Sequence, residues 1–201
     1  MNTRGEQNRS VRNTKRRLRE SLLKLVMRKS LGSVTVKELT DDADVNRSTF
    51  YFHYQDVKAM VKEMEEAFFK DFTSALDAID RKSHDSITIL VGCLESHMDL
   101  CRIVLGENGD IEFLEQMKRI IEDKCSRMWK AAVPEMSDRE REILDSFLIG
   151  GTMTALQNWV RSENRQSAEE LAAVLNRFIF DGIIPVVASW HRRKAWQDEV
   201  Q

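Results

Sequence analysis

The sequence contains little proline and glycine, with 2 Pro and 8 Gly among its 201 residues. Both residue types disfavour helix interiors, and Glu, Lys, Arg and Leu are abundant, so the composition favours a mostly helical protein. A run of about 18 apolar residues is also lacking, and we therefore expect no transmembrane helix and no membrane partner. The first residues lack the apolar core of a secretory signal, which predicts a cytoplasmic protein.

Cysteine is scarce and catalytic motifs are missing. Cys93, Cys101 and Cys125 form an odd set without metal-type spacing, as expected for reduced thiols of a cytosolic protein. His84 and His97 do not complete a metal set with these cysteines, because no close pair has the spacing of ligands. The sequence also contains no Gly-rich phosphate loop, G-x-S-x-G elbow or H-E-x-x-H motif. We expect neither a metal or cofactor nor an enzymatic activity.

The net charge of −2 conceals an uneven distribution of charge. Residues 1–62 contain 14 Lys and Arg against 7 Asp and Glu, a net charge of +7, whereas the remainder contains 17 against 26, a net charge of −9. A cluster of charge is often only a solvated face. A basic first third beside an acidic remainder is, however, the pattern of a module that binds phosphates.

Residues 34–60 predict two short helices joined by a tight turn. Thr35 is followed three residues later by Glu38, which is the spacing of a capping box and predicts a helix start. Asp44 belongs to the residue types that tolerate a left-handed turn conformation, and Asn46 is a good N-cap for a second helix. A helix, a turn of about three residues and a second short helix form a helix-turn-helix.

The second helix is rich in groups that suit a DNA major groove. Phe50 and Tyr54 are expected to face inward, and the hydrogen-bond donors are Arg47, Ser48, Thr49, Tyr51 and His53. Short polar and cationic side chains near a helix N-terminus are what base reading requires. The pattern alone also fits a capped helical corner with a polar outer face.

Residues 46–54, NRSTFYFHY, resemble the recognition-helix signature of the TetR family of bacterial transcriptional regulators. That signature typically runs Ser-Lys-Gly-Thr-Leu-Tyr-His-His-Phe. Thr49, Tyr51 and His53 match it, and the segment TVKEL at residues 35–39 matches the preceding helix. The sequence departs from the family pattern at Thr40, where alanine is usual, at Asp44, where glycine is usual, and at Val57, where lysine is frequent.

The resemblance implies an all-α fold with an N-terminal three-helix DNA-binding domain and a C-terminal helical domain for ligand binding and dimerisation. We accordingly predict a flexible basic arm at residues 1–10, a helix-turn-helix domain at 11–57 and a regulatory domain at 58–196. The sequence of the last part is loosely similar to a subgroup that contains activators of dihydroxyacetone metabolism. Single helices are expected from Ser86 to about Val104 and from Ser167 to a break near residues 182–185.

The same resemblance implies a homodimer that binds a pseudo-palindromic, double-stranded DNA operator, most often as a repressor. Arg47, Ser48 and Thr49 are the expected base readers. Tyr51, His53 and Lys58 are expected on phosphates, with a further backbone contact from Thr35. The alternative is a co-regulator or protein-interaction module of the same fold with weak or no DNA binding.

Two further sets of residues follow from the resemblance, and each is open to the alternative of ordinary core. Relatives pair their last two long helices between subunits, which places the dimer interface here at Phe147, Gly151, Thr154, Leu171, Leu175 and Phe178. The pocket of an unknown small-molecule effector is expected at Cys93, His97, Met117, Met128, Trp129, Met153 and Trp159.

Overall fold

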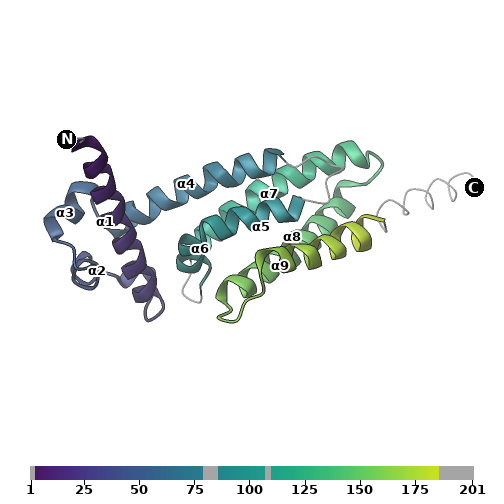
Figure 1. Ribbon diagram of the computed structural model, residues 1–201. Helices are drawn as coiled ribbons and strands as arrows, with labels where there is room; N and C mark the ends of the chain where they lie inside the picture. Colours follow the sequence, from purple (N-terminus) through teal and green to yellow (C-terminus); the bar gives the residue numbers. More distant parts are fainter. Residues whose placement is uncertain (1–2, 79–85, 107–109, 186–201) are drawn as a thin grey trace, which may run out of the picture. The chain divides into compact units, whose positions relative to one another are not determined.

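The structure is a computed structural model that describes residues 3–78, 86–106 and 110–185, and every regular element in these ranges is a helix (Figure 1). The chain divides into two compact units. Unit 1 comprises residues 1–68 and 97–113, and unit 2 comprises residues 69–96 and 114–201. The division falls after residue 68, within a long helix. The predicted domain boundary after residue 57 stays a prediction. None of the helices in the described ranges combines the length and hydropathy needed to cross a membrane.

Unit 1 contains the basic N-terminal part of the chain. Its elements are α1 (Thr3–Val26), a short 3-10 turn (Leu31–Ser33), α2 (Val36–Ala43), α3 (Arg47–His53), the first half of α4 (Val57–Ala78), α6 (Met98–Leu105) and the first residues of α7 (Ile111–Ala132). Helix α1 packs against α2 and against α6, and α2 packs against α3. The flexible arm expected at residues 1–10 differs from the structure, because α1 already begins at Thr3. Extending an existing helix adds one hydrogen bond for each residue fixed, which favours this continuation.

The core of unit 1 is built from one apolar stripe on each helix. Leu18 and Leu22 of α1, Leu39 of α2 and Phe50 of α3 are fully buried, as is Phe68 of α4. Burial of such side chains contributes about 1.5–3 kcal/mol each. The inward direction of Phe50 and Tyr54 was expected from the sequence and is confirmed, with exposures of 0% and 4%.

Caps define the helix-turn-helix as its sequence predicts. The Thr35 hydroxyl accepts a hydrogen bond from Glu38 N while the Glu38 carboxylate accepts one from Thr35 N, which completes the capping box of α2. Asp44 ends α2 in the left-handed conformation, with φ 49° and ψ 51°. Asn46 caps α3 by accepting a hydrogen bond from Ser48 N at 2.9 Å. The turn between α2 and α3 is therefore defined by the backbone conformation of Asp44 at one end and by the side-chain cap of Asn46 at the other.

Unit 2 contains the rest of α4 and α7 together with α5 (Ser86–Ser96), α8 (Asp138–Arg161), α9 (Ala168–Asn176) and a π-helical segment, η2 (Arg177–Ile183). Capping boxes at Ser137 and Ser167 start α8 and α9. The helix start expected from the sequence at Ser167 is confirmed. Helix α5 packs along α9 (Figure 1).

Two helix predictions in this part of the chain were wrong. The single helix expected from Ser86 to Val104 is interrupted at His97, whose φ of −114° and ψ of 27° lie outside the helical region. Its two pieces, α5 and α6, belong to different units. The last helix widens into the π-helical segment from Arg177, ahead of the break expected near residue 182.

Candidate DNA interface and ligand cavity

Helix α3 presents polar side chains opposite its buried face. Arg47, Ser48 and Tyr51 are exposed, and Thr49 and His53 are half-buried. Phe50 anchors the helix and contacts the rings of Tyr51 and Tyr54 at centroid distances of 5.6 and 5.7 Å. The predicted contact residues of this helix therefore share one accessible surface. Lys58, the second residue of α4, is exposed as well.

Two of the predicted contact residues already have hydrogen-bond partners. The Ser48 hydroxyl donates to Asn46 Oδ1 at 2.9 Å, so its lone pairs remain for accepting a hydrogen bond from DNA. The Thr35 hydroxyl donates to Glu38 Oε2 at 2.7 Å, and Thr35 N donates to the same oxygen at 3.0 Å. Because both of its donors are engaged, Thr35 is better suited to capping α2 than to holding a phosphate.

An ion pair links α1 to the turn of the helix-turn-helix. Arg17 Nη2 lies 2.7 Å from Asp44 Oδ2, and the Asp44 side chain is 94% exposed. Sequence reasoning missed Arg17, because nothing in the local pattern connects residues 27 positions apart. The pair places a carboxylate, at the position where the TetR signature usually has glycine, against an arginine of the basic helix.

A partly buried network fixes α3 against its neighbours in unit 1. Lys15 Nζ donates to both Glu63 oxygens at 2.9 and 2.8 Å, and Tyr54 Oη donates to Glu63 Oε1 at 3.1 Å. Burial opposes ionisation of Glu63, yet the hydrogen bonds from Lys15 and Tyr54 hold its pKa below the usual range. Burial and the negative Glu63 raise the pKa of Tyr54. The network joins α1, the end of α3 and α4, so the orientation of the polar surface is fixed.

Unit 2 encloses a cavity of about 240 Å³ between α4, α5, α7, α8 and η2. Its wall is almost entirely apolar and includes Phe72, Leu90, Ile121 and Phe180. Among the described residues, Lys124 is the only charged side chain in the wall, and its Nζ lies 3.7 Å from Asp77. Cavities of this size and polarity bind small apolar molecules.

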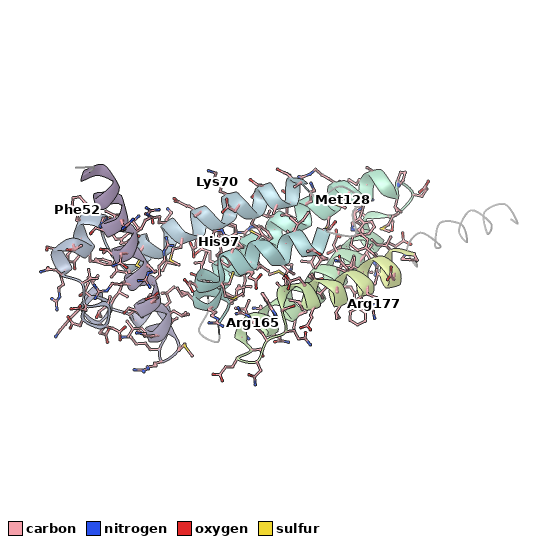
Figure 2. The ribbon with its side chains drawn as sticks, in the orientation of Figure 1. Phe52, Lys70, His97, Met128, Arg165 and Arg177 are labelled. Atoms are coloured by element: carbon pink, nitrogen blue, oxygen red, sulfur yellow. The ribbon has the colours of Figure 1, made fainter. Side chains whose placement is uncertain are left out.

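Four of the seven predicted pocket residues line this cavity, namely Met117, Met128, Trp129 and Met153. The other three do not. His97 lies in unit 1, where its ring packs edge-on against Phe68 at 5.6 Å, whereas Met128 lies in unit 2 (Figure 2). Trp159 donates from Nε1 to the Gln166 carbonyl at 2.8 Å, so it secures the connection between α8 and α9. Cys93 is half-buried outside the wall.

The cysteines are free thiols, as the sequence predicted. Burial, with the negative Asp71 nearby, raises the pKa of Cys93 to about 11. Burial and the carboxylates of Asp145 and Glu122 raise the pKa of Cys125 to about 12. Thiolate is the nucleophilic form, so both residues are poor nucleophiles at neutral pH. Among the described residues, no group of three or more His, Cys, Asp and Glu side chains is arranged to hold a metal ion.

The predicted dimer residues of unit 2 fall into two classes. Phe147 and Phe178 are exposed by 67% and 65%, and Gly151 and Thr154 are exposed too. Leu171 and Leu175 are only 8% exposed and belong to the core within one chain. Two further exposed apolar residues were not among the predicted dimer residues, Ile143 at 64% and Val174 at 46%. They lie four residues before Phe147 and Phe178, which makes one apolar stripe on α8 and another across α9 and η2.

The fold has solved relatives among transcriptional regulators. A TetR regulator from Streptococcus agalactiae 2603V is 21% identical with a TM-score of 0.54, and the match covers 86% of this chain and 97% of that one. A transcriptional regulator from Aquifex aeolicus VF5 is 21% identical with a TM-score of 0.59, and the match covers 82% and 96%. The dihydroxyacetone kinase operon activator DhaS is 16% identical with a TM-score of 0.54, and the match covers 85% and 96%.

A comparison with curated proteins finds no match. Residues 81–192, more than half of the chain, match the family model TetR_C_8, described as the transcriptional regulator C-terminal region. The helix-turn-helix of unit 1 and the helical unit 2 are the two parts that such a regulator requires. The chain therefore belongs to the TetR family of transcriptional regulators.

Proposed function

We propose that the protein is a cytoplasmic repressor that binds a pseudo-palindromic operator as a homodimer and responds to a small-molecule effector. The observation that carries this proposal is the exposure of Arg47, Ser48 and Tyr51 on α3, a helix that is anchored by the buried Phe50. Arg47 is the best base reader, because a guanidinium makes two hydrogen bonds with the O6 and N7 atoms of guanine. Tyr51, His53 and Lys58 hold phosphates beside it.

The exposed stripes of unit 2 support a second copy of this chain as the partner. Gly150 and Gly151 lie inside α8, where each glycine costs about 1 kcal/mol relative to alanine. A Cβ atom added at either position meets no described atom within 4 Å beyond its chain neighbours and the backbone of α8, so packing among the described residues of one subunit does not require glycine there. Close approach of a partner helix between Phe147 and Thr154 explains both residues. A two-fold dimer then reads two half-sites of the operator.

The effector proposed for the cavity is a small, mainly apolar molecule. A cavity of 150 Å³ accommodates benzene, so the volume of about 240 Å³ suits a ligand of about ten non-hydrogen atoms. Lys124 offers a site for one anionic group on that ligand. Helices α4 and α7 each continue from one unit into the other, which gives ligand binding a covalent route to the helix-turn-helix. Preferential binding to one arrangement of the dimer then changes DNA affinity.

A gel-shift series on the DNA upstream of the gene tests the DNA-binding proposal. We expect one discrete complex that resists competition by random duplex and whose affinity falls steeply with salt, because phosphate contacts release counterions. Equal affinity for the upstream DNA and for random DNA of the same length would contradict the operator-binding role. It would favour a module of the same fold that acts through protein partners.

A further inference from the structure

Phe52 is the most exposed large apolar side chain in the described part of the chain, and it lies on the recognition helix. It is 81% exposed, whereas Phe50, two residues earlier, is completely buried (Figure 2). Folding of the helix does not explain this residue, because Phe50 and Tyr54 already supply the inward face of α3. A polar residue at position 52 would serve the monomer equally well. The exposed ring therefore calls for a partner outside the chain.

The position of Phe52 on α3 points its side chain outward together with Ser48. Successive residues of an α-helix are rotated by about 100°, so Ser48 and Phe52 both lie about 160° around the helix from Phe50. They lie on either side of the line that runs along the helix directly opposite Phe50. They are four residues apart and so occupy neighbouring places on the outer surface. The ring of Phe52 is held edge-on against His53 at a centroid distance of 5.0 Å and an interplanar angle of 80°. Its direction is thus restricted by a neighbour that is itself half-buried.

We propose that Phe52 reads thymine by packing against its C5-methyl group in the major groove. The thymine methyl is the apolar group that base edges present there, and phenylalanine is a suitable partner for it. Arg47 and Ser48 recognise hydrogen-bonding edges, so Phe52 adds a contact that distinguishes thymine from cytosine without a hydrogen bond. The inference rests on the proposed binding of α3 to DNA. It predicts that each half-site of the operator contains a thymine that Phe52 contacts.

The experiment replaces single thymines by deoxyuridine, which lacks only the C5-methyl group. Binding sites are first selected from a random duplex library with the wild-type protein, and each thymine of the selected duplex is then replaced in turn. Fluorescence anisotropy measures the affinity of the wild type and of Phe52→Ala. We expect replacement of one thymine, at the same position of either half-site, to lower the affinity of the wild type about fourfold. Burial of one methyl group contributes about 0.8 kcal/mol, which corresponds to that factor. Phe52→Ala should bind the thymine and deoxyuridine duplexes equally.

Met27→Ala is the matched control, since Met27 is an apolar residue of unit 1 with 74% exposure that lies outside α3. It should keep the full difference between thymine and deoxyuridine. If the wild type binds selected sites specifically but no deoxyuridine replacement changes its affinity, the inference is overturned while the proposed function stands. A deoxyuridine effect that persists in Phe52→Ala also overturns it, because another residue then reads the methyl group. If the wild type selects no sequence at all, the proposed function fails and the inference fails with it.

Discussion

Arg47 occupies the first position of α3 and is exposed there, directly after the capping Asn46. Arg47→Ala should cost about 1–3 kcal/mol at specific sites, because a bidentate contact with guanine is lost. Binding to random DNA should weaken much less. Competition anisotropy on selected and random duplexes measures both effects. Arg119→Ala, which removes an exposed arginine of unit 2 paired with Glu115, is the control and should change neither affinity. An equal loss on both duplexes would make Arg47 a phosphate anchor.

Asp44 sets both the turn conformation and the local charge. Its left-handed φ of 49° is tolerated by asparagine, whereas its carboxylate holds Arg17 at 2.7 Å. Asp44→Asn should therefore keep the turn, free Arg17 for a phosphate and raise DNA affinity. One added phosphate contact should steepen the plot of the logarithm of the DNA-binding constant against the logarithm of the salt concentration by about one unit of slope. Stability should change little, because exposed ion pairs contribute only about 0.2–1 kcal/mol.

Asp44→Ala separates the two roles of this residue. It removes the same charge but strains the turn by about 1–2 kcal/mol, since alanine disfavours the left-handed region. Its melting temperature should fall below that of Asp44→Asn, while the salt dependence of DNA binding should steepen alike in both variants. If Asp44→Asn binds DNA more weakly than the wild type, the Asp44–Arg17 pair is needed to position α1 on the backbone.

Sequence reasoning at the level of single residues succeeded where a local rule applied. Thr35, Asn46, Ser137 and Ser167 cap helices because each lies two or three residues before the backbone N–H that it accepts from. Arg17 could not be assigned, since its partner comes from another helix. Phe52 was not among the predicted contact residues, and phenylalanine is usually buried, whereas the structure leaves it 81% exposed.

At the scale of elements, the capping box of α2 makes the stability of unit 1 depend on pH. Hydrogen bonds from Lys29, and then from the Thr35 side chain and backbone, lower the pKa of Glu38 from 4.5 to about 2. The depressed pKa means that the folded state binds the proton less readily than the unfolded state. The stabilisation is therefore fully present above pH 4.5 and is lost as the pH falls through about 2.

Glu38→Gln tests this dependence by thermal unfolding followed between pH 7 and pH 2. The variant should melt lower than the wild type at neutral pH, and the difference should shrink as the pH falls below 4.5. Glu20→Gln removes a carboxylate from the exposed pair with Arg16 without affecting a cap, so it is the matched control. A wild-type-like melting temperature for Glu38→Gln at neutral pH would show that the Lys29–Glu38–Thr35 contacts contribute nothing to folding.

The element boundaries that sequence reasoning missed have a common physical origin. The interruption at His97 carries no glycine or proline, and it is determined by tertiary packing, which assigns α5 and α6 to different units. The widening at Arg177 likewise precedes Gly182 and Pro185, the local signals for a break. Propensity is a weak determinant wherever tertiary contacts compete with it. The spacing of apolar residues thus predicted where the helices lie. It did not predict the interruption at His97 or the widening at Arg177.

At the scale of the whole molecule, residues 46–54 and the charge asymmetry predict the TetR family, and the TetR_C_8 match over residues 81–192 confirms it. The resemblance placed the effector pocket on helices that surround a ligand cavity in relatives, and Met117, Met128, Trp129 and Met153 of that set line the cavity of unit 2. Their role in effector binding stays a prediction. Distinguishing the cavity wall from ordinary core requires coordinates. The exclusion of Trp159, for example, depends on its hydrogen bond to Gln166. The homodimer and its contact residues remain predictions.

Gly151→Leu tests the dimer through a substitution that one subunit tolerates. A Cβ atom at this position meets no described atom within 4 Å beyond its chain neighbours and the backbone of α8, and replacing a glycine inside α8 favours the helix by roughly 1 kcal/mol. Within the proposed interface the same leucine prevents close approach of the partner helix. Sedimentation velocity should therefore show a shift from dimer to monomer, and affinity for a full operator should fall toward that for a half-site.

Gly92→Leu is the matched control for that experiment. Gly92 lies inside α5, is exposed and likewise meets nothing within 4 Å of an added Cβ, so the gain in helix propensity is the same. Its position is outside the stripe formed by Ile143, Phe147 and Thr154, and the dimer should persist. Unchanged dimerisation of Gly151→Leu would exclude this part of α8 from the interface. The paired half-sites of the operator would then require another contact surface between subunits.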